Sequence, residues 1–204
     1  DVRRCASGEV VVAHDADLMR VAGVRGRIVE LTFQQLAEHD VGSGEHIPRL
    51  DDVLDLIVSR GAVVNVEIKA DDDNILRLVR SVAHVLTRRA RKDRDAVLIS
   101  TFHPIACALV RTLMPDLPVG FLYEDNVQGR LLSSLTPRLL RVAAVHPNFS
   151  LVNETSIAQA RRRGFLTNVW TVDDPAEARR LASLRVDGLI TNDVRKIREA
   201  LLNP

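Results

Sequence analysis

Short runs of apolar, mostly β-branched residues alternate along the chain with longer stretches in which apolar residues recur every three or four positions. The short runs predict buried strands at residues 10–13, 63–69, 97–101, 119–122, 142–145, 166–172 and 188–191. The longer stretches predict helices with one buried face at residues 50–59, 73–89, 104–114, 153–163, 175–184 and 194–202. A strand followed by a helix, repeated in this way, predicts βαβ units and a parallel sheet.

Polar side chains lie at the ends of several predicted strands. Their positions help to decide between an open, doubly wound sheet and a closed barrel. The sequence contains neither of the glycine-rich phosphate loops G-x-G-x-x-G and G-x-x-x-x-G-K-[ST]. The polar or aromatic strand-end residues are Glu67, Lys69, Thr101, Trp170, Thr191. Such groups, spread over several strands, are typical of a (β/α) barrel with its site at the carboxyl ends of the strands. No linker divides the chain, so we expect a single domain over residues 1–204.

The charge balance excludes several classes of partner. The 28 basic and 27 acidic residues leave a formal net charge of +1, which gives no support for a nucleic-acid partner. No apolar run approaches the roughly 20 residues of a membrane span, so we expect no stable membrane insertion. The two cysteines make no disulfide framework and have no histidine at a telling spacing. We expect a cytoplasmic protein without a cysteine nucleophile.

Glu67 and Lys69 are the strongest candidates for chemistry. Residues two apart in a strand face the same side, so both charges project together among apolar neighbours. A carboxylate and an ammonium placed so can hold a divalent cation and a phosphate oxygen. They can equally form a structural ion pair, and the spacing leaves both interpretations open.

Other candidates are weaker by themselves. His14 ends a strand beside Asp15 and suits a general acid or base, or a surface turn. Trp170, the single tryptophan, suits an apolar wall for a small substrate, or core packing. His103 and His146 are interpreted as loop residues or as groups that support the site.

Residues 1–15 read DVRRCASGEVVVAHD. This run resembles a signature of the glycerophosphodiester phosphodiesterases, D-V-x-x-T-x-D-G-x-x-V-V-x-H-D, without gaps. Cys5 stands where that family has threonine, and Ser7 where it has aspartate. The resemblance continues in order with L-x-R at 18–20, T-x-x-Q-L at 32–36, I-P-R-L-D-D-V-L at 47–54, E-I-K at 67–69, S-T-F at 100–102, V-W-T-V at 169–172 and D-G-L-I-T-N at 187–192.

The resemblance implies a TIM (β/α)8 barrel of the phospholipase C-like phosphodiesterase type. It implies a phosphoric diester hydrolase that converts small-molecule glycerophosphodiesters to sn-glycerol 3-phosphate and an alcohol, with a divalent cation (Mg²⁺ or Ca²⁺). It further implies that His14 is one of two catalytic histidines and that Asp1 and Glu67 hold the metal. Lys69 then faces the phosphate, and Trp170 lines the glycerol pocket.

The family's H-R motif and the glutamate of its E-x-D motif have no counterpart in the sequence, because both lie upstream of Asp1 in the family pattern. A barrel of this class takes about 250 residues. Counted against the family, the first strand-helix unit and most of strand 2 are lacking, and residues 10–13 belong to a hairpin-like extension. We therefore expect an N-terminally truncated domain that is nearly inactive alone.

Two other functions stay open at this point. One is a catalytically inactive barrel that binds a phosphorylated ligand or acts as a scaffold. The other is a barrel lyase or aldolase in which Lys69 forms a Schiff base with a carbonyl substrate.

Overall fold

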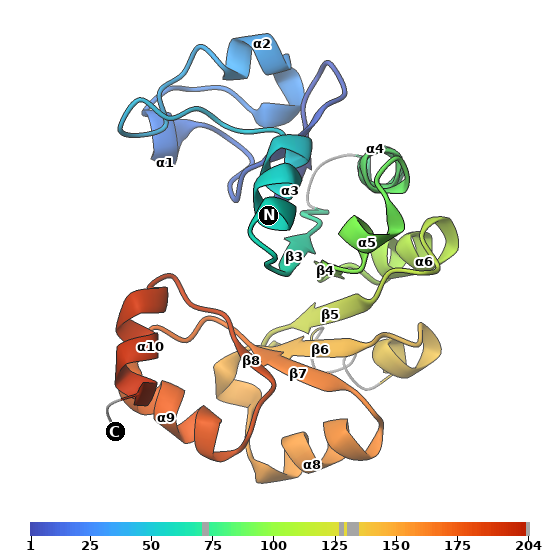
Figure 1. Cartoon of the computed structure of the whole chain (residues 1–204), viewed down its shortest axis with the longest axis vertical. Helices are drawn as coiled ribbons and strands as arrows, with labels where there is room; N and C mark the ends of the chain where they lie inside the picture. Colours follow the sequence, from blue (N-terminus) through green and yellow to red (C-terminus); the bar gives the residue numbers. More distant parts are fainter. Residues whose placement is uncertain (71–73, 127–128, 130–134, 203–204) are drawn as a thin grey trace. The chain divides into compact units, whose positions relative to one another are not determined.

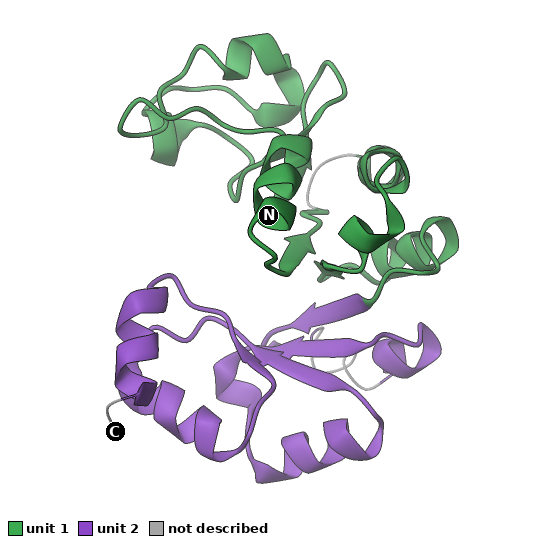
Figure 2. Cartoon of the chain, viewed as in Figure 1, with its two compact units in different colours: residues 1–118 green, residues 119–204 purple. Residues whose placement is uncertain are grey.

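The computed structural model describes residues 1–70, 74–126, 129 and 135–202. The chain forms two compact units, Asp1–Pro118 and Val119–Pro204 (Figures 1 and 2). Each unit combines parallel strands with helices, and each is described by itself. Among the described residues, the helices fall short of the length and apolar character needed to cross a membrane.

The first unit carries two pairs of strands with helices between and after them. Its strands are β1 (Val2–Arg4), β2 (Val10–Val12), β3 (Val64–Glu67) and β4 (Val97–Thr101). Its helices are α1 (Met19–Ala22), the 3-10 turn η1 (Ile28–Glu30), α2 (Phe33–Leu36), α3 (Leu50–Ser59), α4 (Ile75–Thr87), α5 (Arg91–Arg94) and α6 (Pro104–Leu113).

The chain opens with an antiparallel hairpin in which Val2 of β1 faces Val12 of β2. The connecting turn passes through Gly8 at a φ of 108°, a conformation that glycine adopts without a steric penalty. One face of the hairpin packs on a small apolar core of the first 50 residues, whose buried members are Cys5, Val11, Leu18, Ile28, Leu36 and Ile47. The hairpin-like extension predicted for residues 10–13 is confirmed.

Strands β3 and β4 pair in parallel, with Glu67 opposite Ser100. Helix α4 buries the apolar stripe that its sequence predicts and contacts α6 and both strands of the hairpin. Asn74 caps its first turn by accepting a hydrogen bond from the backbone N–H of Arg77. The hairpin is therefore packed between the small core of the first 50 residues and α4.

The second unit is a run of parallel strands, each followed by a helix. Strands β5 (Val119–Tyr123), β6 (Ala144–Pro147), β7 (Leu166–Val169) and β8 (Gly188–Leu189) pair in that order. The helical elements are η2 (Phe149–Leu151), α8 (Glu154–Arg162), α9 (Pro175–Ser183) and α10 (Val194–Leu202). Its core gathers Val152, Ile157, Val169, Val172, Ala178, Leu181 and Ile197.

Most predicted elements are confirmed, and α3 and α10 agree with their predicted ranges residue for residue. Asp174 caps α9, and Pro175 occupies its first turn. The predicted first residue of the helix at 73–89, Asp73, lies outside the described residues. The short helix α5 lies within the charged run at residues 88–95.

The strand predicted at 142–145 is placed two residues too early. The backbone N–H of Val142 donates to the carbonyl of Pro137 and closes the preceding turn, so pairing starts later. Strand β6 consequently contains His146, which is fully buried. The interpretation of His146 as a loop residue was wrong. The strand continues through this polar residue, although the apolar run in the sequence ends before it.

We expect Leu181→Ala to lower the free energy of unfolding by about 2–5 kcal/mol, because this side chain is fully buried in the core of the second unit. Leu202→Ala is the matched control, since Leu202 is 67% exposed and surface changes stay within about 0.5 kcal/mol. Urea unfolding followed by circular dichroism measures both. Equal losses in the two variants would contradict the assignment of this core.

Candidate active site

The sequence candidates Asp1, Glu67 and Lys69 come together where the hairpin meets the end of β3. Val2 forms a parallel bridge with Ile68, and the backbone N–H of Lys69 donates to the carbonyl of Val2. The start of β1 therefore lies beside the E-I-K segment. The Lys69 Nζ is 3.5 Å from Asp1 Oδ1 and 2.6 Å from Glu67 Oε1.

The three charged side chains are largely removed from water. The exposed fractions are 16% for Lys69, 26% for Asp1 and 14% for Glu67. Charges interact more strongly in such a partly desolvated place than on the open surface. Glu67 and Lys69 project to one side, as the strand alternation predicts, and Asp1 adds a second carboxylate to the same ammonium.

Glu67 Oε1 is shielded from solvent, and the Lys69 ammonium 2.6 Å away balances its charge. A carboxylate offers about four acceptor positions, so one ammonium does not occupy them all.

The carboxylates of this cluster are the kind of ligand that a divalent cation takes. Within the described ranges, no group of three or more His, Cys, Asp and Glu side chains is gathered as a metal cluster. Asp1 and Glu67 supply two carboxylates, which are hard oxygen ligands. Mg²⁺ is commonly bound by one or two carboxylates together with waters and substrate phosphate. The residues present therefore fit a cation of this class.

His14 lies just beyond β2 and is fixed through its neighbour Asp15. The Nδ1 atom of His14 is 2.7 Å from Asp15 Oδ1, and Arg20 Nε donates to Asp15 Oδ2 at 2.5 Å. The hydrogen bonds from Arg20 and then His14 lower the pKa of Asp15 to about 2. Asp15 is therefore a carboxylate at any physiological pH, and among the described residues nothing hydrogen-bonds the other ring nitrogen of His14.

Arg3, which sequence reasoning missed, holds the backbone of His14. Its guanidinium donates from Nε and Nη2 to the carbonyl of His14, at 3.1 and 2.8 Å. Arg3 is only 2% exposed, and a buried arginine has to be well hydrogen-bonded. The sequence offers one signal for Arg3, namely a charged residue two positions after Asp1, beside an apolar residue that suits a buried strand.

Trp170 belongs to the second unit, whereas the other four candidates belong to the first. It directly follows β7, is partly buried, and its indole Nε1 donates to the carbonyl of His146 at 2.7 Å. That bond fixes the indole ring against the neighbouring strand β6. A role in binding substrate stays a prediction.

The other two histidines considered in the sequence, His103 and His146, have structural surroundings. Burial lowers the pKa of His146 to about 4, so its imidazole is neutral at physiological pH. Its Nε2 lies 3.1 Å from the Asn168 amide, and Gly120 leaves room for the ring, because a Cβ there would come within 2.5 Å of Nε2. His103 caps α6 by accepting from the backbone N–H of Ile105.

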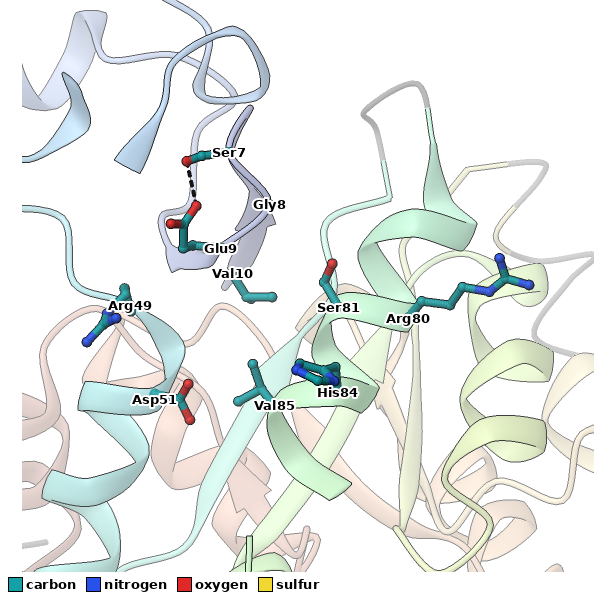
Figure 3. A pocket seen from close by; sticks show the side chains of 10 residues that line it. All are labelled: Ser7, Gly8, Glu9, Val10, Arg49, Asp51, Arg80, Ser81, His84 and Val85. Carbon is teal, nitrogen blue, oxygen red and sulfur yellow. Dashed lines mark hydrogen bonds between the residues drawn. The ribbon is translucent and has the colours of Figure 1, made fainter. Parts of the chain in front are cut away.

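A cavity of about 410 Å³ lies at the turn of the hairpin (Figure 3). Its lining mixes acidic and basic side chains and consists of Ser7, Gly8, Glu9, Val10, Arg49, Asp51, Arg80, Ser81, His84 and Val85. Ser7 already donates to Glu9, and Figure 3 shows Arg80 extending away from the acids. None of the sequence-predicted site residues lines this cavity.

Two solved structures share the fold over the whole chain or nearly so. A phosphodiesterase of Oleispira antarctica, in complex with the product sn-glycerol-3-phosphate, has a TM-score of 0.87 at 22% identity, with 100% of this chain and 83% of that chain covered. A glycerophosphodiester phosphodiesterase of Parabacteroides distasonis has a TM-score of 0.82 at 22% identity, with 99% and 82% covered. The parallel strands and intervening helices thus fit the TIM-like barrel that the resemblance implies.

The sequence comparisons agree with the structural ones. A glycerophosphodiester phosphodiesterase of Caldanaerobacter subterraneus is 26% identical over 202 residues, which cover 95% of this chain and 80% of the relative. The model of the glycerophosphoryl diester phosphodiesterase family matches residues 1–196. The chain belongs to the glycerophosphoryl diester phosphodiesterase family, whose members are phosphoric diester hydrolases.

Proposed function

We propose that this protein hydrolyses glycerophosphodiesters to sn-glycerol 3-phosphate and an alcohol with the help of a divalent cation. The observation that carries the proposal is the Lys69 ammonium held between the carboxylates of Asp1 and Glu67, at the end of a strand and beside the hairpin of His14. Family membership and the product bound in the Oleispira relative support the substrate class.

Asp1 and Glu67 are the residues that would hold the cation, Mg²⁺ or Ca²⁺. When bound, the cation supplies positive charge to the phosphate oxygens as negative charge builds on them. The Lys69 ammonium would neutralise a non-bridging oxygen in the same step. A phosphodiester is an anion that repels nucleophiles, so this concentration of positive charge addresses the main barrier.

His14 would transfer the proton. With Nδ1 engaged by Asp15, the other ring nitrogen can take a proton from the nucleophile, which is water or a hydroxyl of the substrate, or give one to the leaving alkoxide. The resemblance implies a second histidine, which would carry the opposite transfer. Trp170 is proposed to line the glycerol pocket.

We expect hydrolysis of glycerophosphocholine by the full protein that the gene encodes, with Mg²⁺ or Ca²⁺ and without turnover in EDTA. His14→Asn should lower kcat by about 10²–10⁴-fold, because a general acid-base group is lost. Lys69→Met should lower kcat/KM by about 10²–10³-fold through lost charge stabilisation. Release of sn-glycerol 3-phosphate, measured by a coupled dehydrogenase assay, checks each value.

Glu38→Gln is the control for this series, because Glu38 is an exposed acid of the same unit. Its activity should equal that of the unaltered protein. Folded protein with no turnover under either cation would contradict the proposal and favour the inactive barrel that binds a phosphorylated ligand.

Binding of the cation has its own test, which needs no activity. Mn²⁺, used as a paramagnetic probe, should bind at one site, and Glu67→Gln should weaken that binding by about tenfold or more, because half of the carboxylate set is lost. Electron paramagnetic resonance of free Mn²⁺ measures the affinity. Equal affinity in Glu67→Gln and Glu38→Gln would remove Glu67 from the metal site.

A further inference from the structure

We propose that Arg20 is a positioning residue that fixes, through Asp15, the orientation and tautomer of the His14 imidazole. The inference rests on the proposed role of His14 in proton transfer. It assigns a function to Arg20, which the site described above does not need for binding metal or phosphate.

The geometry consists of two hydrogen bonds on opposite oxygens of one carboxylate. Arg20 Nε engages Oδ2 and His14 Nδ1 engages Oδ1. A carboxylate held by a planar guanidinium is fixed in its own plane. Asp15 therefore presents Oδ1 in one direction, and a carboxylate at that place demands a proton on Nδ1. The lone pair of the neutral imidazole then lies on the other ring nitrogen.

His14 needs such support because its side chain is 61% exposed. An imidazole in water rotates and exchanges its tautomers freely unless a partner selects one. The carbonyl of His14 is already clamped by Arg3. The backbone is thus held from the hairpin, and the ring from Asp15 and Arg20.

The element that carries Arg20 is anchored independently of the ion pair. Leu18, just before α1, is fully buried in the small core of the first unit. Asp17 accepts from the backbone N–H of Met19, and Gly23 ends the helix in the left-handed conformation. These contacts fix the backbone at Arg20 whatever its side chain does, so a substitution there tests positioning rather than folding.

Stability alone gives no reason for the Arg20–Asp15 pair. Both partners are partly open to solvent, at 65% and 28% exposure, and ion pairs of that kind contribute little to folding. We therefore expect Arg20→Met to leave the melting temperature unchanged while it alters His14.

The first readout is nuclear magnetic resonance of the protein with ¹⁵N-labelled histidine, assigned with His14→Asn. The unaltered protein should show His14 as the Nδ1–H tautomer at a pH where the ring is neutral, and Arg20→Met should show a mixture. The pKa of Asp15, followed by carboxyl ¹³C shifts, should rise from about 2 toward its ordinary value of 3.8 when the Arg20 hydrogen bond is removed. Arg25→Met, an exposed arginine of the same segment, is the control.

The second readout is whether the substitution changes kcat or KM. Loss of a residue that orients a functional group typically costs about 10–100-fold, so Arg20→Met should lower kcat by about tenfold with KM unchanged. A raised KM with unchanged kcat would overturn the proposal and make Arg20 a substrate ligand. Unchanged tautomer and kcat in Arg20→Met, or equal changes in Arg25→Met, would also overturn it. If the unaltered protein lacks phosphodiesterase activity, the proposed function fails, while the tautomer measurement still decides whether Arg20 orients His14.

Discussion

The pairing of the first strand with the end of β3 is the constraint on which the candidate site depends. The bridge between Val2 and Ile68 and the hydrogen bond from Lys69 to Val2 bring together residues almost 70 positions apart in sequence. Without them Asp1 would not face Lys69. The small core around Leu18 and the contacts with α4 hold the hairpin in that place, so apolar packing ultimately stabilises the charged cluster.

The charged cluster sets one ammonium against two carboxylates. Lys69 Nζ lies 3.5 Å from Asp1 Oδ1 and 2.6 Å from Glu67 Oε1, in a place partly shielded from water. A cation and a phosphate would complement the carboxylates and the ammonium separately, which is the division of roles proposed above.

The second unit uses a neutral polar interior where the first uses charge. Burial keeps His146 unprotonated. Its ring contacts the Asn168 amide, and its backbone carbonyl accepts a hydrogen bond from the Trp170 indole. Three polar groups therefore meet at one point of the sheet. Gly120 and Gly188 leave room for His146 and Asn168, since a side chain at either glycine would collide with them. Trp170 is thus held by the sheet itself.

The sequence by itself determined what depends on neighbours along the chain: the approximate ranges of the longer helices, the shared side of Glu67 and Lys69, and the resemblance carried by residues 1–15. Tertiary structure alone decided the partners of Arg3 and Arg20, the burial of His146, and the later start of β6. The physical reason is that periodicity reports only which side of an element is apolar. The partner of a polar side chain depends on which distant segment packs against it, and that is settled when the core closes.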